Sequence, residues 1–173
     1  MTHDTPGYHI PVLLEQATDI LVSNPDGVYV DGTLGGGGHS GRILQKLGAG
    51  GRLIGIDQDA DAIAYASSQL LHDPRFAVVH ENTIHLRSIL LRHEIASVEG
   101  ILLDLGMSSR QIDSPDRGFS FQHAGPLDMR MDVMSSRTAA DLIAAASREE
   151  LATILFEFGE ERHSRRIADA ILR

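Results

Sequence analysis

The sequence predicts a doubly wound α/β fold whose sheet is mostly parallel, followed by a segment made only of helices. In the first hundred residues, short apolar segments typical of strands alternate with segments in which apolar residues recur at helical spacing. Strands separated by helices pair in parallel through right-handed crossovers. The strands are almost continuously apolar, which indicates a sheet covered by helices on both faces.

The expected elements follow one another in regular order. The first helix ends before the turn signal Asn24-Pro25-Asp26-Gly27, the second before Gly48, and the third before Asp73-Pro74. We expect helices over residues 11–22, 39–47, 60–71 and 86–93. We expect strands over residues 27–31, 52–56, 76–80 and 100–104.

The second half of the chain has a different pattern. Residues 106–132 are rich in Gly, Ser, Pro, Asp and Arg and show no clear period, so a loop is expected there. Ser147 and Glu150 form a capping box that opens a helix ending at Gly159. Another helix is expected over residues 161–172.

These patterns divide the chain into two parts. We expect an α/β domain over residues 1–110 and a loop with a helical insertion over residues 111–173. The chain stops at Arg173, inside the last expected helix, which predicts that the insertion is incomplete.

The composition excludes several classes of protein. The 173 residues include no cysteine, so a disulfide scaffold, a cysteine zinc site and a thiolate nucleophile are excluded. The formal net charge of -9 argues against nucleic-acid binding through bulk positive charge, although a local patch can still bind RNA. No apolar run approaches the roughly 20 residues that a membrane span needs, and the N-terminus has no signal-peptide pattern. We therefore expect a cytoplasmic protein.

The nine histidines show no convincing metal-ligand spacing, so we expect no metal site. His39 opens the helix after a glycine-rich loop and is better explained as a ligand contact. His9 is either structural or lines the cleft.

The glycine-rich loop follows the first expected strand. It runs Val30-Asp31-Gly32-Thr33-Leu34-Gly35-Gly36-Gly37-Gly38-His39-Ser40-Gly41. Glycines allow positive φ angles and let a ligand approach the backbone closely. The loop leads into a helix and so offers backbone N–H groups at the helix N-terminus. Because ligands of open parallel sheets bind at the carboxyl ends of the strands, the loop is more typical of a ligand site than of a flexible turn.

The loop alone leaves two classes of ligand open. Gly36, Gly38 and Gly41 satisfy the pattern of dinucleotide-binding proteins, which favours an NAD-dependent oxidoreductase. Asp31, at the strand end before Gly35, instead favours a ligand with positive charge. S-adenosylmethionine is such a ligand, because it carries an ammonium and a sulfonium group.

Two further carboxylates end strands. Asp57 can accept hydrogen bonds from the ribose hydroxyls of either ligand, or it can cap the next helix, a role that Asp59 could serve equally well. Asp104 ends the fourth strand and is followed by Gly and Ser residues, which permit close approach of a ligand. Asp104 is therefore the best candidate for a catalytic hydrogen-bond acceptor.

The ordered motifs resemble those of one family over nearly the whole chain. They are His9-x-Pro11-Val12-Leu13-Leu14, Asp31-Gly32-Thr33-x-Gly35-x-Gly37-Gly38-His39-Ser40, Gly55-x-Asp57-x-Asp59, Asp104-Leu105-Gly106-Met107-Ser108-Ser109-x-Gln111, Arg117-Gly118-Phe119-Ser120-Phe121, Gly125-Pro126-Leu127-Asp128-Met129-Arg130-Met131-Asp132 and Gly159-Glu160-Glu161-Arg162. This series is similar to the MraW/RsmH family of ribosomal RNA methyltransferases. The fifth and sixth motifs are the most specific.

The resemblance implies a Rossmann-like methyltransferase fold, of which this chain holds the first strands. It implies a bacterial enzyme that transfers a methyl group from S-adenosylmethionine to N4 of a cytidine in the decoding region of 16S rRNA, as naked RNA or in the small ribosomal subunit. Cofactor contacts are implied at Gly37, Gly38, His39, Asp57, Asp104 and Gln111, to which the loop adds Asp31 and Gly35. Thr83 stands where the family has a cofactor-contacting Phe, and it is kept as a candidate cofactor contact at that position.

Four residues of the second half are candidates for contacts with RNA. Phe119 and Phe121 could stack on an unstacked base, or they could anchor the loop to the core. Arg117 and Arg130 could contact phosphates, and Arg130 could equally pair with Asp128 or Asp132.

Members of the family continue well beyond the Gly159-Glu160-Glu161-Arg162 motif. We therefore expect this chain to be a fragment or a shortened relative that lacks the last third of the α/β domain. A truncated module that binds a nucleoside or a protein without turnover is a third interpretation, beside the methyltransferase and the oxidoreductase.

Overall fold

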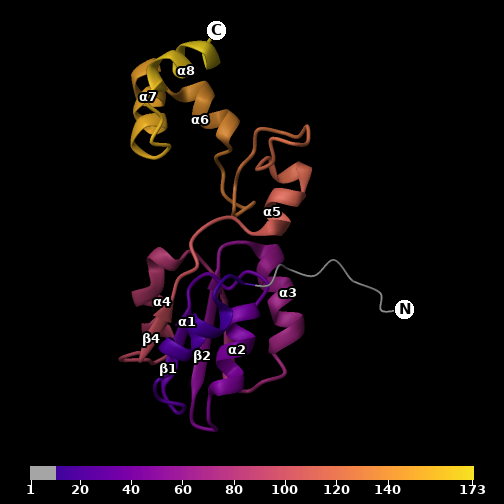
Figure 1. The fold of residues 1–173 in the computed structure, drawn as a ribbon, viewed down its shortest axis with the longest axis vertical. Coiled ribbons are helices and arrows are strands. Elements are labelled where there is room, and N and C mark those ends of the chain that lie inside the picture. Colours follow the sequence, from indigo (N-terminus) through magenta and orange to yellow (C-terminus); the bar gives the residue numbers. More distant parts are fainter. Residues whose placement is uncertain (1–10) are drawn as a thin grey trace, which may run out of the picture. The chain divides into compact units, whose positions relative to one another are not determined.

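A computed structural model describes residues 11–173, so the expectation for His9 lies outside the described residues. The chain forms two compact units (Figure 1). The α/β unit contains the residues up to Asp113 together with Met131–Val133, and the helical unit contains Ser114–Arg130 and Met134–Arg173. Each unit has its own hydrophobic core.

The α/β unit is built on a parallel sheet of four strands in the order β3-β2-β1-β4. The strands are β1 (Val28–Asp31), β2 (Arg52–Asp57), β3 (Phe76–His80) and β4 (Gly100–Leu102). Asp31 pairs with Gly55 of β2 on one side and with Leu102 of β4 on the other. The carboxyl ends of these strands therefore meet at one edge of the sheet, where ligands of such folds bind.

Helices cover both faces of this sheet. They are α1 (Leu14–Leu21), α2 (Gly38–Lys46), α3 (Ala60–Leu70) and α4 (Leu86–Arg92). The first three pack in one hydrophobic core and α4 packs in the other. Neighbouring residues of β1 belong to different cores, because Tyr29 packs in the first and Val30 in the second, both fully buried. The doubly wound parallel fold predicted from the sequence is confirmed.

Where element boundaries differ from expectation, the cause is local. α1 begins at Leu14 and not at residue 11, because Leu13 has a left-handed φ of 54° that a helix cannot include. β4 ends at Leu102, opposite the last residue of β1, and not at residue 104. The expected loop contains the short helix α5 (Ser109–Asp113) and a 3-10 turn over Pro115–Arg117. Such short elements lack enough residues to show a period.

The helical unit contains α6 (Ala139–Ala145), α7 (Arg148–Glu157) and α8 (Ser164–Ile171). The predicted capping box of Ser147 and Glu150 is confirmed at the start of α7, and Thr138 forms a second one with Asp141 before α6. The core of the unit is small and consists of Leu151, Ala152 and Ala168, with partly buried apolar neighbours. Within residues 11–173, no helix is long and apolar enough to cross a membrane.

Gly37 provides a test of how the glycine loop is packed. It precedes α2 with a φ of 78°, and a Cβ there would lie 2.9 Å from Cδ1 of Leu70. We expect Gly37→Ala to lower the free energy of unfolding by about 2 kcal/mol, most of it from the left-handed backbone. Urea denaturation followed by circular dichroism measures this change.

The matched control is Gly41→Ala, in the interior of α2. A Cβ at Gly41 would meet Leu70 at an ordinary distance of 3.7 Å. The variant should keep or raise the stability, because alanine is the better helix former. Equal stabilities of both variants would contradict the packing described here.

Candidate cofactor site

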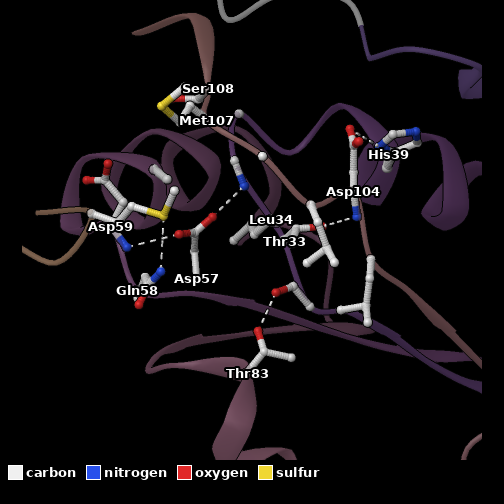
Figure 2. A pocket seen from close by; sticks show the side chains of 18 of the residues that line it. Thr33, Leu34, His39, Asp57, Gln58, Asp59, Thr83, Asp104, Met107 and Ser108 are labelled. Carbon is white, nitrogen blue, oxygen red and sulfur yellow. Dashed lines mark hydrogen bonds and ion pairs between the residues drawn. The ribbon is translucent and has the colours of Figure 1, made fainter. Parts of the chain in front are cut away.

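A cavity of about 890 Å³ lies at the carboxyl ends of the strands (Figure 2). The segments that follow β1, β2, β3 and β4 all contribute to its lining. The lining also includes Pro11, Val12, Ala62, Met131 and two residues of α5. Its size suits a nucleoside-sized ligand. Figure 2 shows Asp57, Gln58 and Asp59 together at one end and His39 with Asp104 at the other.

The carboxylate of Asp57 holds two loops in place. One oxygen accepts a hydrogen bond from the backbone N–H of Gly35 at 2.8 Å, and the other accepts from the N–H of Asp59 at 2.9 Å. The glycine loop is also tied to β2 by a bond from the N–H of Leu34 to the carbonyl of Ile56. Asp57 lines the cavity, so the same side chain shapes the loop and faces a ligand.

The structure corrects the expected role of Asp31. Its side chain is fully buried and does not line the cavity. One oxygen accepts a hydrogen bond from the hydroxyl of Ser40 at 2.7 Å, and the other accepts from the N–H of Thr33. Burial raises the pKa of the Asp31 carboxyl, and the bond from Ser40 opposes that rise. Asp31 thus ties the loop to α2 from behind, and no direct contact with a ligand is available to it.

His39 and Asp104 form the opposite end of the cavity. Nδ1 of His39 lies 3.9 Å from a carboxylate oxygen of Asp104. His39 is only 6% exposed, and among the described residues its buried Nε2 has no hydrogen-bond partner. The side chain of Asp104 is 54% exposed, while its backbone N–H donates to the hydroxyl of Thr33. The end of β4 is thereby joined to the glycine loop, and the Asp104 carboxylate is left facing the cavity.

Gln111 is buried in the cavity wall on α5. Its Nε2 donates to Asp59 at 2.7 Å, and its carbonyl oxygen accepts from the N–H of Ser108. The other oxygen of Asp59 accepts from the N–H of Asp61, so Asp59 is the N-cap of α3. Of the two capping candidates the structure selects Asp59, and Asp57 remains at the cavity.

The remaining predicted loop residues divide between lining and support. Gly35 and Gly38 line the cavity, whereas Gly37 packs against α3 and is absent from the lining. Thr83 lines it too, and its hydroxyl donates to the carbonyl of Gly32. Thr83 therefore braces the start of the glycine loop and supplies no ring for stacking.

Sequence reasoning missed Gln58, Asn82 and Met131, which all line the cavity. Gln58 directly follows β2 and Asn82 lies just beyond β3, so a search for every polar residue after a strand end would have found both. Met131 had no such signal, because a loop residue far along the chain is placed by tertiary structure alone.

The ionisable side chains that line the cavity are mostly acidic. Its ionisable side chains are Asp57, Asp59, Asp104 and His39, and no described lysine or arginine is among the lining residues. Within residues 11–173, no cluster of three or more His, Cys, Asp or Glu side chains could hold a metal ion. The acidic lining is suited to a ligand that carries positive charge.

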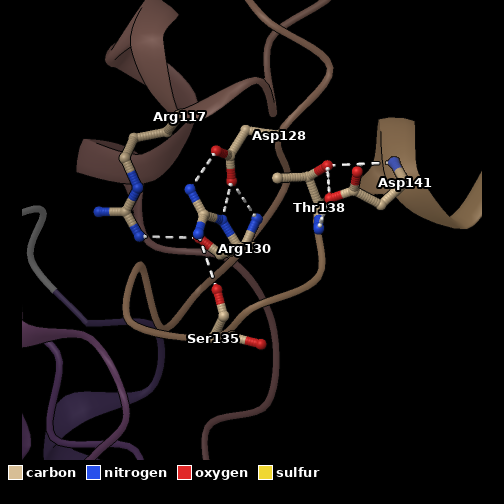
Figure 3. Close-up of polar contacts among 6 residues, drawn as sticks. All are labelled: Arg117, Asp128, Arg130, Ser135, Thr138 and Asp141. Carbon is tan, nitrogen blue, oxygen red and sulfur yellow. Dashed lines mark hydrogen bonds and ion pairs between the residues drawn. The ribbon is translucent and has the colours of Figure 1, made fainter.

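The helical unit holds the residues that were candidates for contacts with RNA. Arg130 forms a bidentate salt bridge with Asp128 (Figure 3). Its Nε and Nη2 donate to the two carboxylate oxygens at 2.9 and 2.7 Å, and its Nη1 donates to the carbonyl of Ser135. Arg130 lowers the pKa of Asp128 to about 2. Arg117 donates to the carbonyl of Arg130, so both arginines organise their own loop. The pairing with Asp128, one of the two that the sequence left open, is observed.

The two loop phenylalanines differ in their surroundings. Phe119 is half-buried, as expected of an anchor, whereas Phe121 is 98% exposed. Of these two rings, only that of Phe121 is free to contact another molecule.

Two variants of Asp31 separate loop support from ligand contact. Asparagine can accept from Thr33 and donate to the hydroxyl of Ser40, so Asp31→Asn should leave the affinity for S-adenosylhomocysteine within about threefold of the wild type. Asp31→Ala leaves both groups unpaired and should cost about 2 kcal/mol of stability. Calorimetric titration and urea denaturation measure the two effects. Loss of binding by a folded Asp31→Asn protein would point back to a direct contact.

Comparison with known proteins identifies the family to which the chain is similar. The model of the MraW methylase family matches residues 7–173. Two relatives bear the name Ribosomal RNA small subunit methyltransferase H. The one from Methylobacillus flagellatus is 52% identical over 95% of this chain and 50% of its own length. The one from Bacteroides fragilis is 45% identical over all of this chain and 56% of its own length.

The chain therefore spans about half the length of the curated relatives it matches. Among solved structures, an rRNA methylase from Streptococcus thermophilus overlaps with 57% of this chain and 57% of its own, at a TM-score of 0.44 and 19% identity. Membership rests on the sequence matches, and the family model covers every described residue. On these matches, the chain belongs to the MraW methylase family.

Proposed function

We propose that this chain is the cofactor-binding part of an enzyme that uses S-adenosylmethionine to methylate N4 of a cytidine in the decoding region of 16S rRNA. The observation that carries the proposal is the acidic cavity at the carboxyl ends of the strands, lined by three aspartates and no lysine or arginine within the described chain. The relatives' name supports the substrate, because both are called small-subunit rRNA methyltransferases.

The charge of the cavity favours S-adenosylmethionine over NAD. A pyrophosphate carries negative charge and needs free N–H groups or basic side chains, but two N–H groups of this loop, at Thr33 and Gly35, are already donated to Asp31 and Asp57. An ammonium and a sulfonium are instead stabilised by carboxylates at short range. The formal dinucleotide pattern of Gly36, Gly38 and Gly41 is therefore outweighed by the residues around it.

The two ends of the cavity suit the nucleoside and the methionine parts of this cofactor. Asp57 stands at the end of β2, where a carboxylate accepts hydrogen bonds from ribose hydroxyls. Asp104 and His39 stand at the opposite end (Figure 2), suited to the amino and carboxylate groups of the methionine part.

The chemistry asked of the protein is modest. S-adenosylmethionine supplies a methyl group that is already activated by the positive sulfur, so no enzyme nucleophile is needed, in keeping with the absence of cysteine. The chain must align the acceptor nitrogen and take up its proton. Asp104 is the exposed carboxylate at this end of the cavity and can accept a hydrogen bond from the amino group of the base as well as from the cofactor.

The RNA contact rests on Phe121. Its exposed ring is suited to stacking on an unpaired base, as in proteins that read single-stranded RNA. Arg117 and Arg130 make hydrogen bonds within the loop that carries Phe121. This supporting role requires no contact with phosphates. A substrate in the small ribosomal subunit implies that the enzyme works in the cytoplasm.

Titration of the purified chain with S-adenosylhomocysteine and with NAD tests the cofactor. We expect binding of the first and none of the second. Asp57→Asn should weaken binding roughly tenfold or more, because it loses a charge-assisted hydrogen bond to the ribose. The control is Asp61→Asn, which removes an exposed carboxylate of α3 that does not line the cavity. Tight NAD binding would overturn the proposal.

Replacement of Phe121 tests the RNA contact. Phe121→Leu should weaken binding to a decoding-region RNA by about tenfold through lost stacking, while S-adenosylhomocysteine binds as before. The control is Phe158→Leu, another exposed phenylalanine of the helical unit. If fluorescence anisotropy gives the same RNA affinity for both variants and the wild type, Phe121 does not stack on the substrate.

A further inference from the structure

The amide of Gln58 joins two distant segments of the chain at one end of the cavity. Its carbonyl oxygen accepts a hydrogen bond from Nδ2 of Asn82 at 2.7 Å, and its Nε2 donates to the sulfur of Met131 at 3.2 Å. All three side chains line the cavity. The methionine belongs to Met131–Val133, three residues that group with the α/β unit although the chain on either side belongs to the helical unit.

A backbone group fixes the direction of each hydrogen bond in this series of side chains. The N–H of Ile84 donates to the side-chain oxygen of Asn82 at 3.0 Å, which turns the amide nitrogen of Asn82 towards Gln58. Gln58 must then offer its oxygen to Asn82 and its nitrogen to Met131. A thioether sulfur can only accept a hydrogen bond, so this orientation of the Gln58 amide gives both Asn82 and Met131 a suitable partner. Met131 is therefore held at a set position and does not merely rest on the surface.

This position lies beside Asp57, the proposed ribose contact. Gln58 is the next residue along the chain, and Figure 2 shows it at the end of the cavity away from His39 and Asp104. If the methionine part of the cofactor lies at Asp104 and the ribose at Asp57, the adenine ring falls among Gln58, Ile84 and Met131. Ile84 also lines the cavity and is 80% exposed, so its apolar surface is free for such a ring.

We propose that Met131 is a cofactor-binding residue whose thioether packs against the adenine ring, and that Gln58 and Asn82 are its positioning residues. The proposal rests on the proposed use of S-adenosylmethionine. Thioether sulfur makes favourable contacts with aromatic rings, and an unbranched side chain adapts to the ring face.

The direct test is NMR of the chain labelled with ¹³C at its methionine methyl groups and titrated with S-adenosylhomocysteine. The sequence has five methionines, and the signal of Met131 is the one that Met131→Leu removes. We expect the ring current of adenine to shift this signal on binding. The signal of Met134, which is 80% exposed and does not line the cavity, should stay in place. In Gln58→Glu, which cannot donate to sulfur, the shift should shrink.

Calorimetry gives the matching affinities. Met131→Ala should weaken binding of S-adenosylhomocysteine and of adenosine by the same factor, about tenfold, because both ligands carry the ring. Met131→Leu keeps the apolar volume and should cost only about twofold, and Met134→Ala should change neither affinity. Thermal unfolding of each variant checks that the fold is intact.

The outcomes separate this proposal from the proposed function. If the wild type binds and Asp57→Asn weakens binding, but the Met131 signal does not shift and Met131→Ala binds like Met134→Ala, the contact with adenine is overturned and the function stands. If the wild type does not bind S-adenosylhomocysteine, both are overturned.

Discussion

The carboxylate of Asp57 is the constraint on which the cavity depends. Placed at the end of β2, it accepts one N–H from the glycine loop and one from the turn into α3, and so fixes two loops that come from different βα units. Each bond satisfies a backbone donor that a glycine-rich loop would otherwise leave to solvent. Because both bonds go to a charged acceptor, they are stronger than neutral ones and hold the loop in one conformation.

The other carboxylates have different roles, because some support the loops and one is exposed to a ligand. Asp31 is buried and bonded behind the loop, Asp59 caps α3 and orients Gln111, and Asp104 alone keeps a largely exposed carboxylate in the cavity. The site therefore concentrates negative charge without repulsion between neighbouring free groups, since most of the oxygens are bonded to N–H or O–H donors. A ligand with positive charge gains from this field over its whole length.

Much of this could be predicted from the sequence, and the limits have physical reasons. The strands and their order of appearance follow from apolar runs and turn signals, and the strand-end residues Asp57 and Asp104 follow from the rule for open sheets. The burial of Asp31 could not be predicted, because residues at a strand end face either the cavity or the helix behind it. The partner of Arg130 and the place of Met131 depend on how a long loop folds back, which no local period encodes.

The uneven pairing of the sheet gives the two ends of the cavity different dynamics. β2 is held by neighbours on both sides, whereas the three residues of β4 pair with β1 alone among the described strands. Local opening is cheapest where few contacts hold a segment. The three paired residues of β4 therefore hold the Asp104 end less firmly than the longer pairing of β2 holds the Asp57 end. A ligand that spans both ends should slow hydrogen exchange most at the Asp104 end.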